Sequence, residues 1–188
     1  TEGSDQLIKM QHSAPWNFGN PIVGSSFGIL FLTRGRAPVV AHKLQYNLTT
    51  DKSGKATEGN WNQRPRDIAN AVKYVATQME RDLNWQIVNL NVDIEALHDS
   101  QILYISGNQA LNFTDAEEAK LKQFVEQGGM ILGHADCSDA KFAKSFKALG
   151  MKLFKSAGEF RKLEPEHPIF TRQQFLWKNW RTKPDLMG

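Results

Sequence analysis

The chain has 188 residues, of which 40% are apolar and 23% charged, and its formal net charge is +3. This composition suits one globular domain with an extension and excludes a wholly disordered or fibrous protein. No apolar run reaches the ~20 residues that a helix needs to cross a bilayer, so we expect no membrane span. The single cysteine, Cys137, excludes an internal disulfide and leaves the compartment, cytoplasm or cell envelope, undetermined.

The first 38 residues differ in character from the rest. Residues 3–24 are rich in Gly, Pro, Asn and Ser and predict irregular structure. Residues 25–33 are apolar nearly all round, a pattern typical of a helix buried in a larger assembly, and Gly35 and Pro38 end it. We therefore predict that residues 1–38 form an N-terminal helical extension that completes the end of another domain.

After Pro38 the pattern alternates between apolar strands and amphipathic helices. Continuous apolar strands are typical of a parallel sheet covered on both faces, and the alternation predicts a doubly wound α/β domain over residues 39–188. The helices begin near Pro65, at a capping box made by Thr114 and Glu117, and at Ser138 or Asp139. The predicted strands cover residues 39–46, 86–90, 102–105, 130–133 and 152–154.

Lysine and arginine outnumber the acidic residues from Lys141 onward, where Trp177 and Trp180 also lie. A basic, aromatic end of this kind suits nucleic acid. However, Lys141, Lys144 and Lys147 follow one another at intervals of three, as on the solvated face of a helix. We therefore expect no nucleic-acid partner.

Polar residues gather where the predicted strands end. In open parallel sheets the ligand crevice lies beyond the carboxyl ends of the strands, and a helix N-terminus there suits an anion. Simpler roles stay open: the tryptophan can pack over the sheet, the Ser-Gly pair can be a turn, and the arginine can be solvated. The candidate ligand-binding residues are Tyr46, Trp61, Asn62, Arg64, Ser106, Gly107, Asp136 and His167.

Cys137 and His134 are the candidate catalytic residues. A cysteine between a strand and a helix can have its thiolate stabilised by the helix N-terminus, with His134 or His167 as its base. Against this, Cys137 is flanked by Asp136 and Ser138, whereas a nucleophile elbow places small residues on either side. The same histidines with Asp136 lack the stricter spacing of a metal site, and we expect no metal and no other cofactor.

Several short motifs resemble, in order, those of a bacterial family of domains of unknown function over about residues 40 to 175. That family is allied to the class I glutamine-amidotransferase-like fold and to the ThuA-like trehalose-utilisation proteins. The motifs are KLQY at 43–46, NWNQRPRD at 60–67, LYISG at 103–107, the glycine pair at 128–129 leading to Asp136 and Cys137, and EHPIF at 166–170.

The resemblance implies a flavodoxin-like three-layer sandwich and no established activity. The glycine-flanked cysteine and downstream His-x-Glu of true amidotransferases are absent, whereas Gly133-His134-Ala135 is similar to the strand end of ThuA-like proteins and implies a pocket there. Such domains usually run beyond the His-Pro motif, which leaves open whether the last strands are missing. Residues 26–39 also resemble the closing helix of a squalene-cyclase or prenyltransferase-like toroid, which implies a preceding domain as an intramolecular partner.

Three functional hypotheses follow. The domain binds a small polar or anionic ligand, such as a sugar or an anion, at the strand ends. Alternatively, it is a hydrolase or transferase of amidotransferase-like ancestry that uses Cys137 with His134 or His167. A third hypothesis is a non-catalytic assembly module that docks onto the toroid or another partner.

Overall fold

The centre of the protein, in a computed structural model, is a four-stranded sheet with the strand order β4-β1-β5-β6. The structure describes residues 20–35, 37–46, 49–50, 56–57, 59–155, 160–164 and 166–171. All three strand pairings are parallel, as the sequence predicts. The strands are β1 (Val39–Leu44), β4 (Asn84–Val88), β5 (Ile102–Gly107) and β6 (Met130–Ala135).

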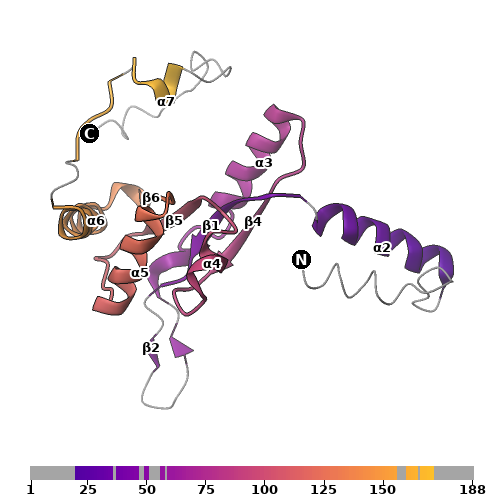
Figure 1. Cartoon of the computed structure of the whole chain (residues 1–188), viewed down its shortest axis with the longest axis horizontal. Coiled ribbons are helices and arrows are strands. Elements are labelled where there is room, and N and C mark those ends of the chain that lie inside the picture. The colour runs from indigo at the N-terminus through magenta and orange to yellow at the C-terminus, as the bar shows by residue number, and fades with distance from the viewer. Residues whose placement is uncertain are drawn as a thin grey trace.

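Helices of different lengths and a small second sheet accompany these strands along the chain (Figure 1). The longer helices are α2 (Pro21–Gly35), α3 (Asp67–Met79), α5 (Asp115–Glu126) and α6 (Ala140–Leu153). The short ones are η1 (Asn60–Asn62), α4 (Ile94–Leu97), η2 (Asp136–Ser138) and α7 (Pro168–Thr171), and a two-stranded antiparallel sheet joins β2 (Thr49–Thr50) to β3 (Ala56–Thr57). The sequence did not predict α4 or the β2–β3 pair.

Helices cover both faces of the sheet, which confirms the predicted flavodoxin-like sandwich. On one face, Leu44, Leu103 and Ile105 pack with apolar side chains of α4, α5 and α6 in a single buried cluster. On the other, α3 packs over a smaller cluster that includes Ala41 and Tyr104. Fully burying one large apolar side chain contributes about 1.5–3 kcal/mol, so the larger cluster is the main source of stability.

The strand order locates the ligand crevice expected for this fold. β1 lies in the interior of the sheet, with β4 on one side and β5 on the other. The chain leaves β1 toward β4 on one side and leaves β5 toward β6 on the other, so these two connections diverge between β1 and β5. In open α/β sheets the crevice opens at such a switch point, beyond the carboxyl ends.

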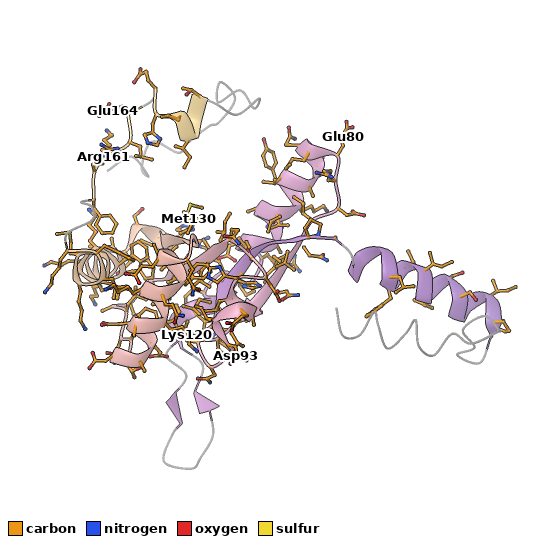
Figure 2. All side chains as sticks on the ribbon, viewed as in Figure 1. Glu80, Asp93, Lys120, Met130, Arg161 and Glu164 are labelled. Atoms are coloured by element: carbon orange, nitrogen blue, oxygen red, sulfur yellow. The ribbon has the colours of Figure 1, made fainter. Side chains whose placement is uncertain are left out.

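Local signals place most helix ends. The capping box is present, since Glu117 N donates to Thr114 Oγ1 and Thr114 N donates to Glu117 Oε2, at 3.3 and 2.8 Å. α3 begins at Asp67, two residues after Pro65, and ends at Met79; the next residue, Glu80, has a φ of 50° and turns the chain away (Figure 2). Lys120 ties α5 to the loop after β4 through hydrogen bonds of 2.8 Å from Nζ to the carbonyls of Leu90 and Val92.

The predicted strand at residues 152–154 is wrong. α6 continues through Gly150 to Leu153. The reason is periodicity: Phe146, Leu149 and Leu153 recur at intervals of three and four and face the same core cluster, so one further helical turn buries Leu153. Position 150 within this helix requires glycine, because the ring of Phe160 lies too close to leave room for a side chain.

The N-terminal helix exists but extends beyond the predicted 25–33. Asn20 begins it by accepting hydrogen bonds at Oδ1 from the backbone N–H groups of Ile22 and Val23, at 2.9 and 3.3 Å. Figure 1 shows α2 projecting away from the sheet, on the opposite side from α7. No helix among the described residues is long and apolar enough to span a membrane. The irregular structure predicted for residues 3–24 is wrong for its last residues, because α2 already begins at Pro21. Residues 3–19 and the basic residues from Arg172 onward lie outside the described part of the chain.

Candidate functional site

The ends of β1, β5 and β6, together with residues 60–67, form what we call the carboxyl edge. One hydrogen bond spans the switch point: the Tyr46 hydroxyl donates to the Ser106 carbonyl at 2.8 Å, and both residues are buried. Gly107 follows, and a side chain there would collide with the Tyr46 hydroxyl and with Asn60. The glycine thus lets residues 60–62 lie directly against the end of β5.

A pair of asparagines fastens η1 to that strand end. Asn60 donates through Nδ2 to Asn108 Oδ1 at 2.7 Å, and its own Oδ1 accepts from Asn108 N at 2.6 Å. Trp61, the next residue, is buried, and its indole N–H has no hydrogen-bond partner in the described residues. Trp61 therefore serves packing and also presents an unused donor.

Lys43 contributes a fully buried positive charge below this segment, with 1% of its surface exposed. Its ammonium donates to Asp67 Oδ1 at 2.7 Å, to the Arg64 carbonyl at 2.9 Å and to Asn62 Oδ1 at 3.3 Å. An ammonium group has three donors, so this set is complete. Lys43 therefore holds residues 62–67 against β1 and has no hydrogen left for a ligand.

Asp67 occupies the N-terminus of α3 from within the protein. Its Oδ1 accepts from Ile68 N at 2.6 Å as well as from Lys43, and Ser106 Oγ lies 3.4 Å from Oδ2. A helix N-terminus stabilises negative charge, and here the charge is supplied by the first residue of the helix itself. Because Asp67 already supplies this charge, the N-terminus of α3 is less suited to an external anion.

Tyr104 connects the buried pair to the surface. Its hydroxyl lies 2.8 Å from His134 Nδ1, and the imidazole of His134 is exposed. Burial raises the pKa of the Tyr104 hydroxyl, and the nearby carboxylate of Asp67 raises it further through its charge and a hydrogen bond. Tyr104 therefore remains protonated and has one hydrogen to donate.

Asp136 is the least satisfied group of the edge. It is 1% exposed, and neither carboxylate oxygen accepts a hydrogen bond from the described residues. Arg64 Nε lies 3.4 Å from Oδ1, within ion-pair distance, but the Arg64 side chain is 54% exposed. A buried carboxylate held this loosely lacks the donors that normally compensate its lost hydration.

Cys137 is exposed, and its Sγ accepts from Arg64 Nη2 at 3.2 Å. Its φ of 55° and that of Ser138, 57°, form a tight left-handed turn between β6 and α6. The N-terminus of α6, however, is capped by Asp139, whose Oδ1 accepts from Lys141 N and Phe142 N at 2.8 and 3.0 Å. The expected stabilisation of a thiolate by this helix therefore competes with a carboxylate already in place.

His167 lies apart from the other candidates. It precedes α7, and its Nδ1 accepts from Ile169 N at 3.2 Å. Figure 1 shows α7 well separated from the sheet. The remaining predicted residues come together at the carboxyl edge: Tyr46, Trp61, Asn62, Arg64, Ser106, Gly107, His134, Asp136 and Cys137.

Lys43 and Tyr104 belong to this edge but were not among the sequence candidates. A signal for Lys43 was present, because a charged residue near the end of a strand covered on both faces is seldom buried without a partner. Tyr104 carried no comparable signal, since an aromatic residue inside a strand is ordinary core composition. No group of three metal-binding side chains is found in the described ranges.

The fold and this edge define a flavodoxin-like α/β domain with a polar strand-end site. The chain belongs to the family of domains of unknown function named DUF4159, whose model matches residues 42–185. No protein of curated function matches the sequence. The matched range contains the whole carboxyl edge and begins after α2.

Proposed function

We propose that this domain binds a small, donor-rich polar ligand, such as a sugar or another polyol, at the carboxyl edge. The observation that carries the proposal is Asp136, a buried carboxylate that accepts no hydrogen bond from the described residues and lies beside the exposed side chains of Arg64 and Cys137. Leaving a buried polar group unsatisfied costs about 1–3 kcal/mol, and more for a charged one. A ligand hydroxyl that donates to Asp136 would remove this cost on binding.

The charges at the edge favour a neutral polar ligand over an anion. The N-terminus of α3 already holds Asp67, and Asp136 adds a second negative charge. Arg64 is the one exposed cation in contact with Asp136 among the described residues. Its exposed side chain can adjust its position to ligands of different shapes. The similarity of Gly133-His134-Ala135 to the strand end of ThuA-like proteins supports a pocket at this edge, and we propose a bacterial origin from the family resemblance. We propose a preceding toroid from the separate resemblance of residues 26–39 to the closing helix of such a domain.

Titration by two-dimensional NMR tests the proposal, with the Trp61 indole N–H as reporter. The probes are glycerol, glucose, sucrose and myo-inositol, set against sodium phosphate and sodium acetate as anions. We expect a saturable shift of the Trp61 signal with a polyol or sugar, lost in Asp136→Asn and retained in Asp93→Asn, an exposed residue at α4. Saturation by phosphate or acetate alone would contradict the proposal, as would the absence of any saturable shift.

Contact between Arg64 and Cys137 supports a second candidate, a hydrolase or transferase in which Cys137 is the nucleophile. Arg64 Nη2 donates to Sγ at 3.2 Å, and the thiolate is the reactive form of a cysteine. Iodoacetamide should then label Cys137 faster than free cysteine at neutral pH, and Arg64→Gln should slow the labelling. Equal rates for the protein and the free amino acid would exclude this candidate.

The apolar surface of α2 supports a third role, docking of this domain onto a neighbouring domain. Ile22, Phe27 and Leu30 are 79%, 64% and 58% exposed, and a continuous apolar surface of this kind marks an interaction site. We propose that α2 belongs to the interface with the preceding helical domain. Phe27→Ser with Ile29→Ser should then reduce concentration-dependent association of the isolated chain in analytical ultracentrifugation, and unchanged association would argue against it.

A further inference from the structure

We propose that the outer edge of β6 is an interaction surface for a later segment of this chain, residues 175–177 with their neighbours, which adds a fifth parallel strand to the four-stranded sheet. The inference concerns the surface beside β6 and does not depend on the proposed ligand. It follows from the open edge of β6, from the apolar surface on both sides of that edge, and from the direction in which the chain leaves α6.

β6 is the last strand of the sheet, and one of its two edges meets no other strand among the described residues. Met130 N donates to Gln101 O at 2.8 Å, at the edge that faces β5. The backbone groups of successive residues in a strand point to opposite edges, so those of Ile131 and Gly133 face away from β5. β6 contains no lysine, no proline and no break in its register, which are common means of protecting an edge strand.

Apolar surface borders this open edge on both faces of the sheet. On the α3 face, Met130 and Leu132 are 46% and 47% exposed. On the other face, a largely apolar groove of about 470 Å³ lies beside the start of β6, between the ends of α5 and α6. Phe160 lines this groove and packs on Phe146, with ring centroids 6.2 Å apart. A strand that occupies the edge must therefore be apolar on both of its own faces.

The hand of the connections directs the chain after α6 to this edge. α5 and α6 pack in the same apolar cluster, on one face of the sheet. Connections between parallel strands are right-handed in about 98% of cases, and the connection through α5 steps outward from β5 to β6. A connection of the same hand through α6, on the same face, steps outward again. The next strand of the chain therefore falls on the open side of β6.

The sequence then selects the segment. The described residues after α6, at 160–164 and 166–171, contain no strand. Residues 172–188 lie outside the described part of the chain, and their longest apolar run is Phe175, Leu176 and Trp177. Three consecutive apolar residues give a strand that is apolar on both faces, as this edge requires. The family model extends through residue 185, so this run belongs to the same domain as β6.

Amide hydrogen exchange, measured by NMR on the full chain, tests the pairing residue by residue. The Leu132 and His134 amides face β5 and serve as the inner reference. If a strand pairs with the open edge, the Ile131 and Gly133 amides donate to it and should be protected as the inner amides are. Rapid exchange of these two outer amides beside protected inner ones would overturn the inference.

Variants of the full chain identify the occupant. Phe175→Asp with Trp177→Asp should speed exchange of the outer amides roughly tenfold or more, the effect of losing one hydrogen bond, and leave the inner amides protected. Arg181→Asp with Lys183→Asp, which adds two aspartates beyond the apolar run, should leave the outer amides unchanged. Should the first double variant also lose the protection of the inner amides, Leu176→Asp repeats the test with a single change.

Two other occupants give distinct results. Protection of the outer amides that rises with protein concentration would assign the edge to a second copy of the chain. Protection that is independent of concentration and survives the changes at residues 175–177 would assign it to another segment. Either result would overturn the assignment to residues 175–177.

Discussion

The same strands form both faces of the sheet, but the side chains are apolar on one face and largely polar or charged on the other. Toward α4, α5 and α6, the strands β1 and β5 present Leu44, Leu103 and Ile105, and all three are fully buried in one apolar cluster. Toward α3, the same strands present Lys43 and Tyr104, followed by Ser106 near the carboxyl edge. Successive side chains of a strand point to opposite faces, so one strand serves both purposes.

The difference shows how this domain separates stability from its candidate site. Among the described residues, three helices pack on the apolar face, whereas α3 is the helix that packs on the other face, where Met130 and Leu132 of β6 are 46% and 47% exposed. Lys43 and Tyr104 lie on that side with partners at 2.7 and 2.8 Å, whereas the carboxylate of Asp136 accepts no hydrogen bond from the described residues. Changes on the apolar face should therefore act on folding, and changes on the α3 face on the site.

The largest expected effect is on the apolar face, at Phe124. Its side chain is fully buried between α5 and the sheet, and Phe124→Ala should lower the free energy of unfolding by about 4 kcal/mol through lost burial and a cavity. Urea denaturation followed by circular dichroism measures this loss. Leu132→Ala, on the open face at 47% exposure, is the matched truncation and should cost less than about 1 kcal/mol. Similar losses at the two positions would refute the contrast between the faces.

Lys43→Met should produce the next largest effect, from the α3 face. Removing one partner of a buried ion pair leaves the other charge uncompensated, and we expect a loss of about 3 kcal/mol in the free energy of unfolding. The double variant Lys43→Met with Asp67→Asn should recover part of this loss, which a double-mutant cycle measures. Lys122→Met, which breaks an exposed pair with Glu126, should cost about 0.5 kcal/mol or less. Additive losses in the cycle would mean that Lys43 and Asp67 are not coupled.

Lys43 also shows which features of this protein can be predicted from the sequence and which cannot. Apolar runs and helix caps predict the four strands of the sheet and the three principal helices around it, because these signals are local. The rule on strand ends then brings Tyr46, Ser106 and Asp136 together. What the sequence does not reveal is the pairing of Lys43 with Asp67, since that depends on how residues 60–67 lie over β1.

The predictions that failed have the same physical origin, namely contacts between segments that are distant in the sequence. The motif Lys-Leu-Phe at 152–154 resembles a strand in isolation, but the packing of Leu153 against the core continues α6 instead. The proposed role for Asp136 likewise depends on its burial and on the absence of hydrogen-bond donors to it among the described residues, which no spacing in the sequence indicates. His167 belonged to the candidate set on residue type alone, and α7 places it elsewhere.

His42 is the exception on the apolar face and predicts a pH dependence of stability. It is fully buried, its ring nitrogens have no well-formed hydrogen bond in the described residues, and burial lowers its pKa, with the charge of Asp99 in partial opposition. The unfolded chain therefore takes up the proton first, as the pH falls below about 6.5. Stability is complete above that value and decreases as the pH falls toward the folded-state pKa, by at most about 1.4 kcal/mol per pH unit.

His42→Leu should remove this contribution. Urea denaturation from about pH 8 to pH 5 should show a smaller loss of stability in the variant than in the unmodified chain across the window below the ordinary imidazole pKa. His98→Gln is the control, because His98 lies near the surface and bonds to Gln127 Oε1 at 3.0 Å. Parallel pH profiles for His42→Leu and the unmodified chain would show that His42 is not held neutral by burial.

The smallest expected effect is at Tyr46, where the two faces meet. Its ring belongs to the apolar cluster, while its hydroxyl donates to the Ser106 carbonyl at the carboxyl edge. Burial and the charge of Asp136 raise the pKa of Tyr46, so the hydroxyl stays protonated and the bond persists across the neutral range. Tyr46→Phe keeps the packing and deletes this bond, which should cost only about 1 kcal/mol of the free energy of unfolding. Amide exchange at Gly107 and Asn108 should nevertheless quicken, while exchange within α5 should change no more than the global loss requires. Faster exchange in α5 than at the strand end would mean that Tyr46 supports the apolar face rather than the site.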